Sequence, residues 1–502
     1  MGLFSRLFGG GKEGDGPMGG EMAANPKRPV VLVHGYSDVG KSFVPWAEVL
    51  KKRGFTIETI NIVTYKSLTN EVTVKDLAEG FDRALRKKGI TGDFDAIVHS
   101  TGMLVLRSWL TANRDDLSRR NRLRHLIGFA PATWGSPLAA QGRGWLGSVF
   151  KGNKSTDIEN APDFLEAGDL ILDALELASR FTWDLAHRDL FGKDEDGKPI
   201  IFYGPSDTTP YPFIFCGNVA YGGFRKLVNK PGTDGTVRWA GVSLDSLKFS
   251  VDLTKEEGNE KRVVPAIPHG VTAPVVFVDD RNHGTIMSQP EAGMADLVVQ
   301  ALNVATKADF DKWLDDAAKY TKGNKPKDDW QHFVIHMIDE RGDPIRDYHV
   351  ELFNVKDGKA DALPFDLDLW AYQADKSFRS YHVDLTQLRE EVTGALWMRV
   401  TLSSGTFLVA YNGESNKGFP PEEELKKLPG ESDPEFELRR DSRPTEIHLN
   451  LSPFMQEDSP YQLFFPFTTT LVEITIDREP LPIGEFVARV CKFEDLAALG
   501  LT

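Results

Sequence analysis

The chain has 502 residues, which is more than one hydrophobic core normally organises, so we expect at least two domains. Its formal net charge is −15 at pH 7, and such an acidic chain is a poor partner for nucleic acid because phosphate binding needs a basic surface. The two cysteines, Cys216 and Cys491, exclude a disulfide framework and a Cys-x-x-Cys metal site.

The N-terminal region has the composition of a disordered tail. Residues 1–28 are rich in glycine and charge and cannot bury enough apolar surface to fold. The sequence has neither a signal-peptide pattern nor an apolar run long enough to span a bilayer. These features predict a cytoplasmic protein, with two alternatives: a position at the periphery of a membrane, or export without a signal peptide.

From residue 29 to residue 321, apolar strand patterns alternate with helical patterns, which is typical of a mostly parallel sheet covered by helices. Continuous apolar runs predict strands over 30–33, 56–62, 95–99, 126–130, 212–217 and 275–278. Apolar residues at helical spacing predict helices over 42–53, 74–88, 101–112, 290–306 and 309–320.

The third of these strands ends at a candidate nucleophile, Ser100. The segment His99-Ser100-Thr101-Gly102 joins a strand to a helix, as a nucleophile elbow does, and Gly102 allows the close approach that such a turn needs. Val98 stands where the usual pattern has its first glycine. The alternative is that Ser100 is only the N-cap of the helix that follows.

A second motif competes with this interpretation. The segment from Gly35 to Ser42, GYSDVGKS, matches the phosphate-binding loop pattern, and the strand Val275–Val278 with its following aspartates could serve as the acidic strand of such a site. In the other interpretation, His34-Gly35-Tyr36 is an oxyanion loop in which the Tyr36 backbone N–H faces a carbonyl oxygen. The order of the motifs favours the second, because a phosphate loop leaves Ser100 unexplained.

The segments HGY, HSTG and APATWGSPLA, in this order, resemble the lipase and esterase branch of the α/β-hydrolases over residues 29–305. The resemblance implies hydrolysis of carboxylic esters, often of lipids, without metal or cofactor. It also implies a triad of Ser100, Asp234 and His283, in which Tyr36 and Thr101 supply the oxyanion N–H groups.

The acid and the base of this triad each have a competing interpretation. Asp234 precedes a glycine in a tight loop, which is also a common plain turn. We prefer His283 to His269 as the base, because His283 follows the strand 275–278 and would reach the carboxyl edge of the sheet. Residues 141–211 form an amphipathic helical insertion between two predicted strands, and this insertion is either a mobile lid or a fixed cap.

After a linker at 322–329, the pattern changes to short strands separated by turns, which predicts an antiparallel β-sandwich over residues 330–502. The expected strands are 332–339, 348–355, 377–385, 396–402, 407–411, 445–451 and 470–476. We interpret Asp357, Asp361, Asp366 and Asp368 as solvated carboxylates rather than calcium ligands, and the acidic stretch 413–443 as a mobile loop. The aromatic run Tyr461–Phe467 either touches lipid or packs on the catalytic domain.

The sequence therefore predicts a serine hydrolase for carboxylic esters, most of all lipid esters. The expected partner is the lipid or other ester substrate, and the C-terminal domain is a candidate contact for a membrane surface or another protein. The two alternatives are a nucleotide-binding protein that uses GYSDVGKS and an inactive hydrolase-fold scaffold.

Overall fold

The computed structural model describes residues 28–34, 41–60, 71–140, 169–222, 229–406, 409–420, 427, 429–430, 444–455 and 462–480. The predicted N-terminal tail up to residue 27, most of the predicted acidic loop and Tyr461 lie outside these residues. Within the described part, none of the helices combines the length and the apolar composition that crossing a membrane would require.

A parallel sheet forms the first half of the molecule, as predicted. Its strand order is β2-β1-β3-β4-β5-β8, and every neighbouring pair is parallel. The strands are β1 (Val30–Val33), β2 (Ile57–Ile60), β3 (Phe94–His99), β4 (Leu123–Phe129), β5 (Tyr211–Gly217) and β8 (Val275–Val278). All residues of β1, β3, β5 and β8 are buried, which explains why these strands are continuous apolar runs in the sequence.

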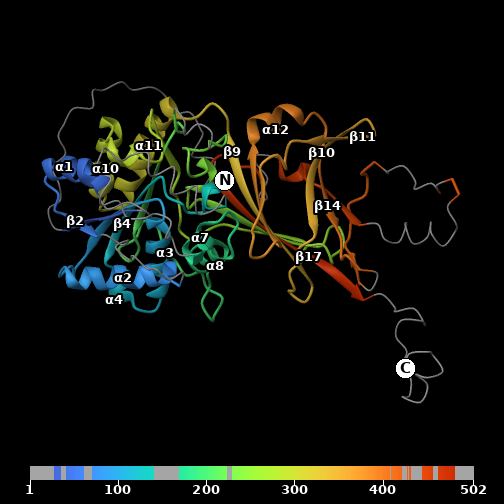
Figure 1. Ribbon diagram of the computed structural model, residues 1–502, viewed down its shortest axis with the longest axis horizontal. Helices are drawn as coiled ribbons and strands as arrows, with labels where there is room; N and C mark the ends of the chain where they lie inside the picture. The colour runs from blue at the N-terminus through green and yellow to red at the C-terminus, as the bar shows by residue number, and fades with distance from the viewer. Residues whose placement is uncertain are drawn as a thin grey trace, which may run out of the picture.

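Helices cover both faces of this sheet. In Figure 1, α1, α10 and α11 lie on one face, and α2, α3 and α4 lie on the other. The helices of this half are α1 (Val44–Lys52), α2 (Val74–Lys87), α3 (Gly102–Ala112), α4 (Leu117–Arg120), α5 (Pro137–Ala140), α7 (Asp169–Leu175), α8 (Arg180–Asp189), α9 (Thr285–Ser288), α10 (Ala292–Leu302) and α11 (Lys307–Asn324), with short 3₁₀ turns at Lys41–Phe43 and Trp239–Gly241. We call the parallel sheet and these helices the α/β part.

Two further sheets form what we call the β part. The outer sheet has the antiparallel order β11-β10-β14-β16, with β10 (Tyr348–Lys356), β11 (Lys359–Leu363), β14 (Ala395–Leu402) and β16 (Thr445–Asn450). The mixed sheet has the order β12-β13-β9-β17-β6-β7, and β15 also pairs with β17. Its strands are β6 (Ser246–Asp252), β7 (Val263–Ala266), β9 (Trp330–Asp339), β12 (Leu369–Ala371), β13 (Phe378–Asp384), β15 (Val409–Asn412) and β17 (Thr469–Pro480). A short helix, α12 (Leu385–Glu391), and a 3₁₀ turn at Ser452–Phe454 complete the β part.

The mixed sheet corrects two expectations. β17 pairs in parallel with both β9 and β6, so the sheet is not antiparallel throughout. β6 and β7 lie within the range that we assigned to the catalytic domain, yet they extend the mixed sheet. The reason is the alternation along β6, in which Leu247, Phe249 and Val251 are buried in the core between the mixed and outer sheets.

The mixed sheet has a core on each face. One face shares a hydrophobic core with the outer sheet, which includes Ile335 of β9, Val350 of β10 and Ile474 of β17. The other face contributes Val334 and Leu471 to the core of the α/β part. The long β17 strand therefore runs through the junction of the two parts, as Figure 1 shows.

Two aromatic side chains of the run that ends at Phe467 are buried. Phe464 is 7% exposed and its ring lies 5.9 Å from that of Phe333 in the core of the β part. Phe467 is 9% exposed and its ring lies 4.8 Å from that of Phe277 in β8. The lipid-contacting alternative therefore does not hold for these two side chains.

A buried arginine also joins the two parts. The fully buried Arg238 follows the candidate acid Asp234 in the α/β part, and it forms a 2.8 Å ion pair with Asp368 and a 2.6 Å hydrogen bond to the Ser380 hydroxyl in the β part. Burial lowers the pKa of the neighbouring His382 to about 4, so this ring is neutral near pH 7. Burial opposes ionisation of Asp368, but His382 and Arg238 outweigh it and hold the pKa of this carboxyl below its usual range. Asp368 is therefore a structural ion-pair partner and not a solvated carboxylate.

Replacing Phe467 tests the packing between the two parts. Phe467→Ala removes a buried ring, so we expect a loss of about 3 kcal/mol in the free energy of unfolding and a melting temperature lower by several degrees. Leu367→Ala is the matched control, because Leu367 is 78% exposed and its loss should change stability by less than about 0.5 kcal/mol. Equal melting temperatures for the two variants would contradict the packing described above.

Replacing Asp368 tests the buried ion pair and its dependence on pH. Asp368→Asn leaves the Arg238 guanidinium buried without its anionic partner, so we expect a loss of about 3 kcal/mol at pH 7. Because the pKa of Asp368 is lowered in the folded protein, its contribution is complete above the usual aspartate pKa of about 4 and decreases as the pH falls below it. Urea unfolding at several pH values should show this convergence of wild type and variant.

The exposed Asp361 provides the control for this experiment. Asp361→Asn should match the wild type at every pH, since this side chain is exposed. A stability difference for Asp368→Asn that grows as the pH falls would have the wrong sign for the proposed ion pair.

Candidate active site

Ser100 occupies a strained turn between β3 and α3. Its φ angle is 53°, in the left-handed region that residues with a side chain rarely adopt. The N-cap of α3 is Thr101, and no side-chain capping hydrogen bond is formed there. The interpretation of Ser100 as a simple helix cap therefore does not fit, and a strained serine at the end of a central strand is a feature of functional sites.

The turn leaves little space for a side chain at Gly102. A Cβ atom on this residue would lie 3.0 Å from the carbonyl oxygen of Val33 in β1 and 3.3 Å from the Cβ of Val98 in β3. The glycine on the helix side thus allows the first turn of α3 to approach two strands closely. Val98, which replaces the other glycine of the usual pattern, is fully buried beside it.

Asp234 and His283 are in direct contact. Asp234 follows β5 and His283 follows β8, so both lie beyond the carboxyl ends of parallel strands, as Ser100 does beyond β3. The His283 Nδ1 lies 3.0 Å from the Asp234 Oδ2, and the His283 backbone N–H donates to the Asp234 carbonyl oxygen at 3.1 Å. Both side chains are fully buried. The backbone N–H groups of Thr236 and Val237 donate to the other carboxylate oxygen at 2.9 and 2.8 Å, which fixes the orientation of the carboxylate.

His99, which sequence analysis did not single out, links this pair to Ser100. Its Nε2 donates to the backbone carbonyl oxygen of His283 at 2.9 Å, and the two rings lie 4.6 Å apart. Because a carbonyl only accepts, the proton of His99 is on Nε2, and burial holds the pKa of this ring well below its usual value. The residue immediately before Ser100 therefore positions His283. The signal was present in the HSTG motif, but no local pattern reveals a partner 184 residues away.

Of the two predicted oxyanion donors, Thr101 lies within the described residues and Tyr36 does not. Among the described residues, the Thr101 backbone N–H donates to no other backbone carbonyl, which is the condition for binding an external oxygen at the start of α3. Tyr36 lies outside the described residues, together with the rest of the segment 35–40 and the side chain of Lys41. The phosphate-loop alternative thus stays a prediction.

The remaining candidates give no second site. The backbone N–H of His269 donates to the Leu190 carbonyl oxygen at 2.9 Å, at the end of α8, while the contact with Asp234 is made by His283. In the described ranges, no three His, Cys, Asp or Glu side chains are grouped so that they could hold a metal ion.

In the described part of the insertion, residues 169–211, buried polar contacts join the segment to α3. Arg107 of α3 forms a bidentate ion pair with Asp189 of α8 at 2.8 and 2.9 Å, and both side chains are fully buried. The Tyr203 hydroxyl donates to the same carboxylate at 2.6 Å. Opening this segment would leave a buried charge without its partner, which costs several kcal/mol.

The β part holds the other end of this segment. The Tyr372 hydroxyl donates to the carboxylate of Asp173 in α7 at 2.8 Å, and the Trp370 indole N–H donates to Glu176 at 2.9 Å. Residues 141–168, the rest of the predicted insertion, lie outside the described residues, and the choice between a mobile lid and a fixed cap stays a prediction.

The chain is similar to known proteins in structure. No protein-family model and no curated protein matches the sequence. Among solved structures, phospholipase PlaB from Legionella pneumophila is similar with a TM-score of 0.67 and 21% identity, over 93% of this chain and 98% of that one. Its complex with thio-NAD gives a TM-score of 0.66 with the same identity and coverage. The mature lipase BlEst2 from Bacillus licheniformis is 17% identical, with a TM-score of 0.33, over 53% of this chain and 89% of that one.

The similarity to the Legionella structure extends over the α/β part and the β part together, because it covers nearly the whole length of both chains. In this chain, a parallel sheet carries helices on both faces, and β3 passes into α3 through the turn at Ser100. The chain therefore has the α/β-hydrolase fold of lipases and esterases, with an additional β part.

Proposed function

We propose that this protein is a serine hydrolase that cleaves carboxylic esters, with Ser100, His283 and Asp234 as its catalytic triad. The observation that carries the proposal is the strained φ angle of Ser100 beside a buried aspartate–histidine pair. The similarity in fold to a protein described as a phospholipase supports the same reaction class.

The proposed mechanism uses each contact of the site. Because the His283 Nδ1 proton is directed to Asp234, Nε2 carries the lone pair that accepts the Ser100 proton. The Ser100 Oγ attacks the ester carbonyl, and His283 then returns the proton to the leaving alcohol. Water attacks the acyl-enzyme with the same base, and the acid product leaves. The backbone N–H groups of Thr101 and Tyr36 hold the oxyanion in both steps.

The substrate class that we propose is a lipid ester. The support is the similarity over nearly the whole chain to a protein described as a phospholipase.

The two alternatives explain fewer of these observations. A nucleotide-binding protein would use Lys41 but would have no use for a strained serine or for the contact between Asp234 and His283. An inactive scaffold would have no reason to keep Ser100 at a φ angle of 53°, since glycine adopts this angle without strain.

Replacing the nucleophile tests the reaction. Ser100→Ala should lower kcat for a soluble aryl ester by at least about 10³-fold, because the covalent step is lost while oxyanion binding remains. A fluorophosphonate probe should label the wild type at Ser100 and leave the variant unlabelled. Ser118→Ala is the matched control, since Ser118 is exposed in the short helix α4. Full esterase activity in folded Ser100→Ala would refute the proposal, and absence of labelling in the wild type would favour the scaffold.

The physical state of the substrate tests the lipid assignment. For one ester series measured on both sides of the critical micelle concentration, we expect activity to rise when micelles form, because a site for lipid esters meets its substrate at a high local concentration at an interface. Rates that follow only the monomer concentration would favour a soluble-ester esterase. The wild-type melting temperature, measured with and without micelles, separates this effect from unfolding by the amphiphile.

A further inference from the structure

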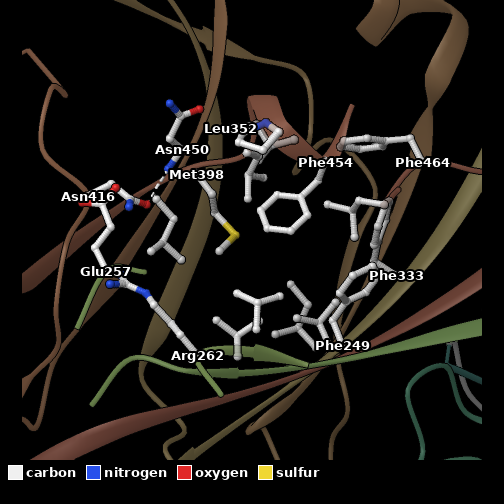
Figure 2. A pocket seen from close by; sticks show the side chains of 18 of the residues that line it. Phe249, Glu257, Arg262, Phe333, Leu352, Met398, Asn416, Asn450, Phe454 and Phe464 are labelled. Atoms are coloured by element: carbon white, nitrogen blue, oxygen red, sulfur yellow. Dashed lines mark hydrogen bonds between the residues drawn. The ribbon is translucent and has the colours of Figure 1, made fainter. Parts of the chain in front are cut away.

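A cavity of about 220 Å³ lies between the mixed and outer sheets of the β part. Its walls are mainly apolar and come from both sheets and from the chain after β16. The apolar lining includes Phe249, Phe333, Leu352, Met398, Phe454 and Phe464. Figure 2 shows the aromatic rings on one side of the cavity and Met398 directed into it. None of the candidate catalytic residues lines this space.

The opposite side of the cavity is polar. Figure 2 places Glu257, Asn416 and Asn450 there, and the guanidinium of Arg262 is directed to the same side. Arg262 is only 5% exposed, and its Nη2 donates to the Glu414 carbonyl oxygen at 2.6 Å. Its Nη1 is buried and has no hydrogen-bond partner among the described residues. A buried donor without a partner is costly, and an arginine beside an apolar cavity is suited to a carboxylate.

The charges around this end allow one anion. The two asparagines are neutral, and the Asn450 backbone N–H donates to the Asn416 side-chain oxygen at 3.0 Å. Two acidic side chains, Glu257 and Glu414, lie near Arg262, and both are exposed, so water screens their charges more than that of Arg262. The buried charge at the polar end is thus positive.

We propose that this cavity is a second ligand site, which binds one fatty acid with its acyl chain between the two sheets and its carboxylate on Arg262. An apolar cavity of about 150 Å³ holds benzene, so the larger volume here corresponds to a chain of roughly eight to ten carbons. Met398 can adapt to the shape of such a chain, since its side chain is unbranched and flexible. The site goes beyond the proposed ester hydrolysis and does not depend on it.

Titration calorimetry with the full-length protein tests the site. We expect affinity to rise by about fourfold for each added CH₂ from hexanoate to decanoate, and to stop rising once the cavity is full. Arg262→Gln should weaken decanoate binding by at least about tenfold, because the charge-assisted bond is lost. The same change should alter decanol binding by less than about twofold, because decanol carries no charge. Arg341→Gln is the control, since Arg341 is exposed and does not line the cavity.

Two further variants keep the test valid if Arg262→Gln does not fold. Met398→Trp fills the cavity and should abolish binding of both ligands. Glu257→Gln removes an exposed negative charge near the carboxylate and should tighten decanoate binding without affecting decanol. Decanoate that binds equally well to wild type, Arg262→Gln and Met398→Trp would occupy some other site, and the proposal would then be wrong. The proposal would also be wrong if decanoate did not bind to the wild type at all.

Discussion

The loop from residue 232 to residue 239 is held from two sides, and the geometry of the candidate active site depends on this constraint. On one side, Asp234 contacts His283. On the other side, Arg238 is anchored to Asp368 and Ser380 of the β part. Gly232, with a φ angle of 69°, lies so close to this part that a Cβ atom would be 2.5 Å from the ring of His382. The position of the candidate acid is therefore set jointly by two parts of the chain.

The backbone pairing in the mixed sheet also joins segments that are far apart in the chain. β17, the last described strand, lies between β6 and β9 and pairs in parallel with both. β6 can complete its pairing only after residues 469–475 have been synthesised. Contacts between such distant segments carry a large loop-closure cost, so this junction is expected to form late in folding. A chain that ended before β17 would expose the unpaired edges of β6 and β9.

The sequence predicted the features whose signals are local. Continuous apolar runs located β1, β3 and β8, and the position of Ser100, Asp234 and His283 after three different predicted strands indicated one edge of one sheet. The errors concern long-range partners. The pairing of β6 with β17 joins residues more than 200 positions apart, and nothing within β6 identifies its neighbour. Asp368 looks like any acidic loop residue until Arg238 is placed beside it. The aromatic residues near Phe467 could be assigned to a core only once both cores were known.

One short segment of the mixed sheet serves two ends of the candidate site. Asp368 holds the loop of the candidate acid. Trp370 donates to Glu176, directly after the helix α7, and Tyr372 donates to Asp173 within it. Five consecutive residues, 368–372, thus hold both the loop of the acid and the helical segment around α7. Strain applied to this edge strand, by a bound partner or by a cut in the chain, would therefore act on the loop of the candidate acid and on the helical segment together.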